Sequence, residues 1–214
     1  MSTAEPLTLV LPSALTIERP LAKLLAFARE EYETYDAVVM PLESTITIHD
    51  ITLTMMVNSR LTAPGARSIY RARERIERGL AYIPADVSLL NDHAAVPWDA
   101  IYALFNEFET IKGAKLAIAT KILHRKRPHL IPMIDNKVFG HYAGGCPTLL
   151  TLKMGPVAVR SMELFRDDLL AVRGRVEALT FYLEEHGFPL TPVRVLEILI
   201  WVECNKQEPY YSAV

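Results

Sequence analysis

The apolar residues of this chain recur with the spacing of helices along most of its length. In the segment that opens at Pro20, Leu21, Leu24 and Ala28 mark one face, as residues three and four apart do on a helix. Proline suits a first helical position because its missing N–H has no partner there. We therefore expect a helix over residues 20–34.

Other helices are expected where the same spacing lies between cap residues, prolines and glycines. The run Thr47-Ile-His-Asp50 resembles a capping box and predicts a helix through Asn58, although the alternation of residues 45–48 would also suit a short strand. Further helices are expected at 66–79, 97–109, 114–125, 135–143, 157–186 and 192–204. Strand patterns are otherwise nearly absent, so we predict an all-α fold.

The segment 157–186 carries an apolar stripe with gaps of four and three residues: Phe165, Leu169, Val172, Val176, Leu179 and Leu183. Such a stripe is typical of a packing seam. It could face the core or a second copy of the chain, so a homodimer stays open.

Length and composition predict one domain, residues 1–214, because 214 residues with 50% hydrophobic content can bury a sizeable core. No stretch approaches the roughly 18 apolar residues of a membrane span. The N-terminus lacks the basic start and cleavage site of a signal peptide. We expect a cytoplasmic protein with no membrane partner.

The metal-binding residue types are too few or too scattered for a metal site. Cys146 and Cys204 are the two cysteines, fewer than a four-cysteine zinc site or an iron–sulfur cluster needs. The six histidines show no metal-ligand spacing. We expect no metal and no cofactor.

Charge is distributed unevenly along the chain. The formal net charge of −2 argues against a protein that coats nucleic acid without specificity. Between residues 112 and 137, however, the local balance is +6, from one acid, Asp135, and seven basic residues, Lys112, Lys115, Lys121, Arg125, Lys126, Arg127 and Lys137. The cations at 125–127 could simply solvate a helix end, but the wider clustering favours an anionic ligand.

This basic region has three parts. Gly113 precedes a helix, where a glycine permits a tight turn and lets backbone N–H groups approach a phosphate. On that helix Leu116, Ala119 and Leu123 share one face, and Lys121, His124 and Arg125 share another. We expect the helix to be apolar inward and basic outward.

An apolar connector follows, fixed by Pro128 and Pro132, and it leads to Asp135 at the start of a helix over residues 136–142. Asp135 is therefore a candidate helix N-cap. It is also the candidate catalytic residue of the chain.

Two resemblances bear on this region. The run Ala-Thr-Lys-Ile-Leu-His-Arg-Lys-Arg-Pro-x-Leu-Ile-Pro-x-x-Asp, with flanking segments 83–86 and 190–196, resembles a bacterial domain family of unknown function over roughly residues 45–204. That resemblance implies a helical core at 45–204, with residues 1–44 as an N-terminal helical segment packing on it. It implies no activity.

The second resemblance is to the helix-hairpin-helix DNA glycosylases of the endonuclease III type, and it covers about 30 residues. Gly113 resembles the first glycine of the hairpin, Ala119 the small helix residue, and Ile134-Asp135-Asn136-Lys137-Val138 the aspartate motif. The resemblance implies a helical glycosylase-like fold in which hairpin amides bind the phosphate backbone. Asp135 would stabilise oxocarbenium-like charge or activate water beside a flipped nucleotide.

In this interpretation DNA is a better candidate partner than RNA, and one set of residues would contact it: Gly113, Lys115, Lys121, His124, Arg125, Lys126, Arg127, Asn136 and Lys137. Two positions depart from the family pattern. Lys115 replaces the second hairpin glycine, and Ala117 stands where bifunctional members carry their Schiff-base lysine. The resemblance therefore favours monofunctional base excision.

Two alternatives remain open on sequence alone. The fold could serve as a nucleic-acid-binding module without chemistry, in which case the basic residues matter and Asp135 acts only as a cap. The chain could also be a helical interaction protein of a defence or toxin system, with the stripe of 157–186 as its interface.

Overall fold

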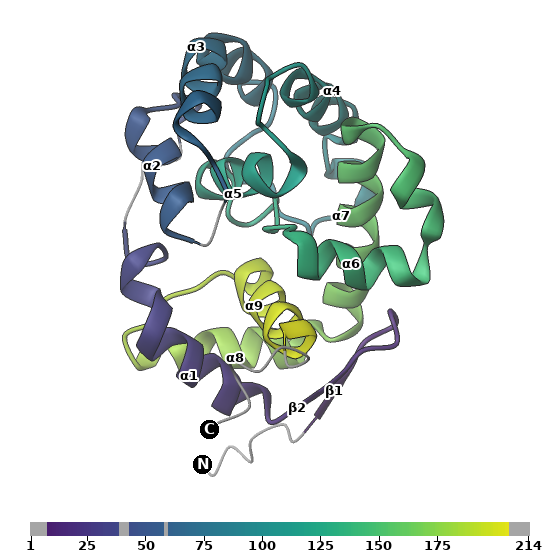
Figure 1. Cartoon of the computed structure of the whole chain (residues 1–214). Helices are drawn as coiled ribbons and strands as arrows, with labels where there is room; N and C mark the ends of the chain where they lie inside the picture. The colour runs from purple at the N-terminus through teal and green to yellow at the C-terminus, as the bar shows by residue number, and fades with distance from the viewer. Residues whose placement is uncertain (1–7, 39–42, 58–59, 206–214) are drawn as a thin grey trace.

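Amphipathic helices supply most of the architecture, as the computed structural model in Figure 1 shows for residues 8–38, 43–57 and 60–205. The α-helices of these residues are α1 (Pro20–Glu31), α2 (Ile48–Met56), α3 (Ala63–Leu80), α4 (Trp98–Glu109), α5 (Leu116–Lys126), α6 (Asn136–Gly145), α7 (Met154–Ala171), α8 (Arg173–Glu185) and α9 (Pro192–Asn205). Three short 3-10 turns complete them: η1 (Tyr32–Thr34), η2 (His93–Ala95) and η3 (Pro147–Thr151). The prediction of an all-α fold is confirmed.

Local sequence signals fixed several helix starts. Thr47 and Asp50 form the predicted capping box of α2: the Thr47 N–H donates to Asp50 Oδ2 at 2.8 Å, and the Asp50 N–H donates to Thr47 Oγ1 at 3.2 Å. Thr191 caps α9 by accepting from the Arg194 N–H at 3.1 Å. The last residue of the predicted α2 segment, Asn58, lies outside the described residues.

The single helix predicted over 157–186 is wrong, because two helices, α7 and α8, occupy this segment. The break is at Val172, whose backbone leaves helical geometry at φ −112° and ψ 14°. The apolar stripe nevertheless stays buried across the break, since Phe165, Val176 and Leu183 have no exposed surface. It belongs to the core of the chain, which removes its proposed role as a dimer contact.

A two-stranded antiparallel hairpin, β1 (Thr8–Val10) and β2 (Thr16–Glu18), was not predicted. Each strand has three residues, too few to establish an alternating pattern. Its turn is fastened to α7, because the Ser13 N–H donates to Asp168 Oδ1 at 2.9 Å and the Ser13 hydroxyl to Oδ2 at 2.6 Å. Tyr142 of α6 donates to the same carboxylate at 3.0 Å.

The helices are arranged around α5. In Figure 1, α3 and α4 lie above it and α2 lies to its left, while α1, α8 and α9 form the lower part of the molecule. Buried apolar residues from Leu9 to Ile200 make one continuous cluster that links both parts. Residues 118–126 of α5 are all buried. None of the described helices has the length and apolar character needed to cross a membrane.

Candidate functional site

Asp135 ends the connector between α5 and α6 and caps α6. Its Oδ1 accepts from the backbone N–H of Lys137 at 2.8 Å and of Val138 at 3.1 Å. The cap predicted from sequence is confirmed. Connector residues Leu130, Ile131 and Ile134 are almost fully buried, so the carboxylate is held by a fixed backbone.

The second oxygen of Asp135 faces α9. Trp201 donates its indole N–H to Asp135 Oδ2 at 2.9 Å, which ties the start of α6 to a helix 66 residues later in the chain. A carboxylate offers about four acceptor positions. Among the described residues, three N–H groups donate to the Asp135 carboxylate. Roughly one of its acceptor positions is left for a ligand.

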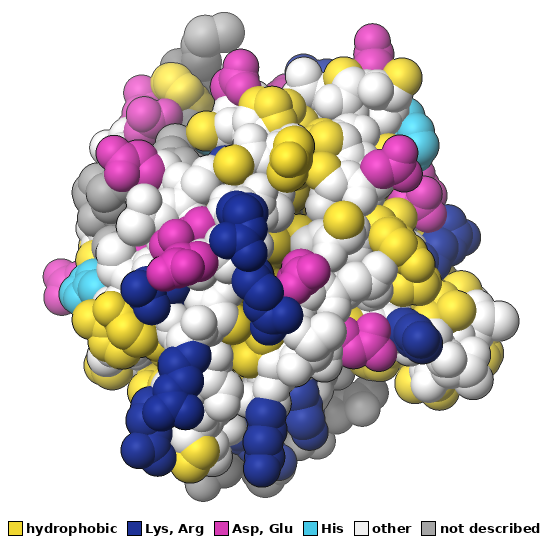
Figure 2. Space-filling view, turned by 90° about the horizontal axis from the view of Figure 1, so that it is seen from above, with side chains coloured by type: hydrophobic (Ala, Val, Ile, Leu, Met, Phe, Trp, Pro, Cys, Tyr) yellow, Lys and Arg dark blue, Asp and Glu magenta, His cyan; other side chains and the backbone are white. Residues whose placement is uncertain are grey.

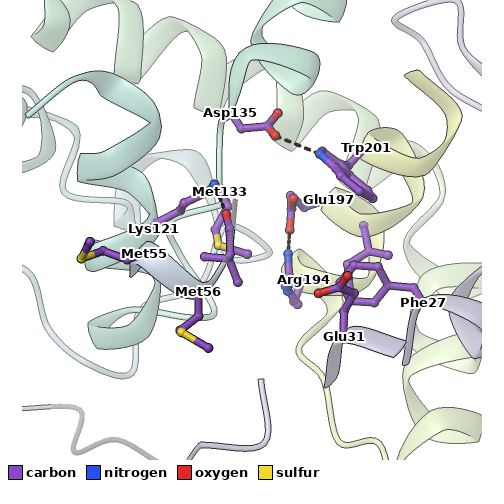
Figure 3. Close-up of a pocket in the computed structure, with 12 residues that line it drawn as sticks. Phe27, Glu31, Met55, Met56, Lys121, Met133, Asp135, Arg194, Glu197 and Trp201 are labelled. Carbon is purple, nitrogen blue, oxygen red and sulfur yellow. Dashed lines mark hydrogen bonds and ion pairs between the residues drawn. The ribbon is translucent and has the colours of Figure 1, made fainter. Parts of the chain in front are cut away.

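Asp135 and Trp201 belong to the wall of a pocket of about 390 Å³ between α9, α1, α2 and α5 (Figure 3). Figure 3 shows Asp135 and Trp201 on one side, Lys121 on another, and Glu197 and Arg194 between them. Apolar side chains cover much of the remaining wall: Phe27, Met55, Met56, Val57, Met133 and Ile198. Such a lining suits a flat, largely apolar ligand group held by a few polar contacts.

Two charged residues of α9, Arg194 and Glu197, reach the pocket from the largely apolar first half of the helix. Arg194 is buried and binds the carboxylate of Asp36 through Nε at 2.8 Å and through a terminal nitrogen at 2.9 Å. It also donates to Glu197 one turn along α9. This buried arrangement fixes the preceding segment, around Asp36, against α9.

Glu197 is a further carboxyl of the pocket, and unlike Glu31 it is buried. Burial raises the pKa of Glu197 to about 7, opposed by the Arg194 guanidinium and assisted by the negative charge of Asp135. A group with this pKa exchanges its proton near neutrality. The sequence analysis missed Glu197, Arg194 and Trp201, and the signal was the pair of opposite charges three residues apart in an apolar helix.

Lys121 is the basic residue that α5 contributes to the pocket wall. Its ammonium donates to the carbonyl of Val57 at 2.6 Å, at the end of α2, and burial lowers the pKa of Lys121. Its own carbonyl accepts from the Tyr35 hydroxyl at 2.7 Å. Lys121 thus lies beside the candidate catalytic aspartate, although its predicted position on an exposed face is wrong.

The prediction that α5 is basic outward is wrong for its last turn as well. The side chains of His124, Arg125, Lys126 and Arg127 are between 1% and 7% exposed, because α5 lies in the centre of the fold. Burial lowers the pKa of His124 to about 4, and its Nδ1 lies 2.7 Å from the Ile131 carbonyl. These side chains do not form the phosphate-binding surface that the sequence suggested.

Each buried cation has a protein partner instead. Arg125 donates to the carbonyls of Tyr35, at 2.7 Å, and Val38. Arg127 donates to the carbonyl of Leu80, the last residue of α3, at 3.1 Å and to that of Ile83, just after it, at 2.6 Å. Lys126 pairs with Asp50 at 2.9 Å. Carbonyls at helix ends lack intrahelical partners, so cations there satisfy them and fasten neighbouring segments to α5.

The remaining residues predicted to contact nucleic acid lie in two places, at the start of α5 and at the start of α6. Gly113 has φ +88°, so the predicted tight turn is present, and its Cβ position would lie 3.1 Å from the Cα of Gly65. Lys115 is exposed at the start of α5. Asn136 is exposed and Lys137 half-buried beside Asp135. The structure therefore places Asp135, Lys121 and Lys137 near one another and Lys115 apart, at the other end of α5.

The part of the chain that the structure describes holds no group of three His, Cys, Asp or Glu side chains arranged to bind a metal ion. The two cysteines, Cys146 and Cys204, are free thiols.

Comparison with known proteins gives one match. The model of a protein family of unknown function matches residues 17–204, a longer stretch than the sequence resemblance suggested. No curated protein matches, and no solved structure matches.

Proposed function

The chain belongs to the DUF6308 family, whose function is unknown, and we propose from the pocket itself that it hydrolyses the N-glycosidic bond of a nucleotide in DNA. The observation that carries the proposal is the Asp135 carboxylate, which the α6 cap holds in the wall of a pocket lined by aromatic and thioether side chains. A flipped base stacks well against such side chains.

The pocket has a suitable size and chemistry for one base. Its volume of about 390 Å³ falls within the range of roughly 300–1,000 Å³ of small-ligand sites. Phe27 and Trp201 pack edge to face, with ring centroids 6.2 Å apart, and the methionines at the opposite wall adapt to irregular shapes. This combination supports a planar ring as the ligand.

The proposed reaction uses two carboxyl groups of the pocket in different roles. The bond between C1′ and the base nitrogen breaks, and a water oxygen bonds to C1′. Asp135 stabilises the positive charge that develops on the sugar and takes the proton of the water. Glu197 gives its proton to the departing base, a role that fits a pKa near 7.

The test is base release from duplexes that carry a panel of damaged and modified bases, with alkali used to reveal abasic sites. Asp135→Asn keeps a good helix cap but removes the charge, so we expect release to slow by at least about 100-fold. Asp99→Asn makes the same change in the first turn of α4, on an exposed residue away from the pocket, and should leave release unchanged.

A second function is favoured by one observation. Asp135 already accepts three hydrogen bonds from Lys137, Val138 and Trp201, which is what a purely structural carboxylate does. In that case the chain binds nucleic acid without chemistry. No base release from any substrate, with duplex binding intact in the parent protein and in Asp135→Asn, would establish this alternative and refute the hydrolase.

A further inference from the structure

The exposed face of α3 carries a row of arginines. Arg67, Arg71 and Arg78 are exposed and, at 100° per residue, lie within about 40° of one another around the helix axis. None of the three makes a hydrogen bond or ion pair with another described residue. Three unpaired guanidinium groups on one helix face leave a concentrated positive charge towards solvent.

The other arginines of α3 show what a paired arginine looks like on the same helix. Arg73 contacts Glu74 at 3.5 Å and stacks on Tyr70, with its guanidinium 4.6 Å from the ring centroid. Arg75 contacts Glu107 of α4 at 3.4 Å. Glu74 is the one acidic residue of α3 on the same side as Arg67, Arg71 and Arg78, and its carboxylate already pairs with Arg73.

The hairpin before α5 extends this charge. The close approach of Gly113 to Gly65 brings the hairpin against the start of α3. The flanking Lys112 and Lys115 are exposed and unpaired within the described residues. Figure 2, a view from above onto the side of α3 and α4, shows several Lys and Arg side chains on this face, with acidic side chains next to some of them. We call Arg67, Arg71, Arg78, Lys112 and Lys115 the α3 basic surface.

The shape of this surface fits a nucleic-acid backbone. The row from Arg67 to Arg78 spans roughly 17 Å at 1.5 Å per residue, about the axial rise of five nucleotides of one strand. A guanidinium binds phosphate oxygens through paired hydrogen bonds, which a lysine cannot do. We propose that the α3 basic surface is where the sugar–phosphate backbone of duplex DNA docks.

The surface is connected to the pocket through α2. That helix packs against both α3 and α5, and its Met55 and Met56 line the pocket. A duplex held on α3 would therefore lie beside the helix that borders the proposed base site. The inference takes the identity of the partner from the proposed function, but it requires binding alone and no chemistry.

The experiment measures anisotropy of a labelled duplex at salt concentrations between 50 and 200 mM. The test variant is Arg67→Gln/Arg71→Gln/Arg78→Gln. The control is Arg29→Gln/Arg160→Gln/Arg173→Gln, which removes the same charge from exposed arginines of α1, α7 and α8. Each phosphate contact contributes a slope of about −0.9 to the dependence of log affinity on log salt, so losing three contacts should make the slope about 2.7 less steep. The affinity lost between 50 and 200 mM salt should then be roughly 40-fold smaller in the test variant than in the parent.

Each result decides the matter. A weaker salt dependence in the test variant with a parent-like control supports the α3 basic surface. An equal loss in both variants, full binding by the test variant, or binding to anionic vesicles without binding to the duplex overturns it. Base release is measured in parallel. If the test variant binds the duplex and releases bases like the parent, the proposal for the α3 basic surface fails and the proposed hydrolase stands. If duplex binding depends on the α3 basic surface but no base is released, the hydrolase fails and the docking surface stands. Circular dichroism of each variant confirms that it is folded.

Discussion

Replacing Lys126 by methionine tests whether the basic run of α5 is internal to the fold. Its ammonium lies 2.9 Å from Asp50 Oδ1, and the two side chains are 2% and 0% exposed. Removing one partner of a buried ion pair leaves the other charge uncompensated, which costs about 3–5 kcal/mol. For a domain of this size, at about 2–4 °C per kcal/mol, the melting temperature should fall by roughly 6–20 °C.

The assay is urea unfolding followed by far-ultraviolet circular dichroism. Lys112→Met is the matched control, because it removes the same charge from an exposed residue and should change stability by no more than about 0.5 kcal/mol. Asp50→Asn/Lys126→Met should recover part of the loss, since it removes the uncompensated carboxylate but keeps an oxygen to cap α2.

A loss below about 1 kcal/mol in Lys126→Met would refute this reasoning, because that is the range of an exposed ion pair. It would mean that water reaches the pair, and the outward basic face expected from the sequence would then regain support. A double variant no more stable than Lys126→Met would show that the uncompensated charge is not the source of the loss.

Two further predictions concern backbone geometry and pH. Gly113→Ala should destabilise by about 1–2 kcal/mol, because φ is +88° and its Cβ would lie 3.1 Å from Gly65 Cα. Gly174→Ala, in α8 with open space around it, should not destabilise in the same unfolding assay. The pKa of Glu197 is raised from 4.5 to about 7. The contribution of this shift to the free energy of unfolding is therefore fully present below pH 4.5 and is lost as the pH rises to about 7. Glu197→Gln should remove that fall in the free energy of unfolding. The lowered pKa of His124, from 6.5 to about 4, makes the free energy of unfolding rise over an overlapping pH range. The measurement is therefore the difference in unfolding free energy between variant and parent at each pH. A pH profile that is unchanged in Glu197→Gln would contradict the raised pKa of Glu197.

Helix positions followed from the sequence because caps and apolar spacing are local. The capping box of Thr47 and Asp50, the cap of Asp135 and the turn at Gly113 each depend on residues within a few positions. The break at Val172 could not be predicted, since the apolar stripe continues across it and only the packing of two separate helices reveals it.

One residue of the pocket wall, Asp135, was singled out from the sequence, as a helix cap and through the glycosylase resemblance. Its partner Trp201 lies on a helix 66 residues away, and no local pattern joins the two. The basic residues 124–127 were predicted to be exposed because charged side chains usually are. Its burial depends on carbonyls at the ends of other segments, such as those of Leu80 and Val38, which sequence spacing does not reveal.

The buried cations of α5 also bear on how the molecule moves. Residues 35–38, the end of α3 and the start of α2 are all held by the last turn of one helix, through Arg125, Arg127 and Lys126. Segments that share an anchor open together, so this region belongs to a single cooperative unit with few independent local openings. Motion that admits a ligand to the pocket is therefore expected at the border that α1 forms, where Phe27 and Glu31 line the wall, and the α5 end of the site stays rigid.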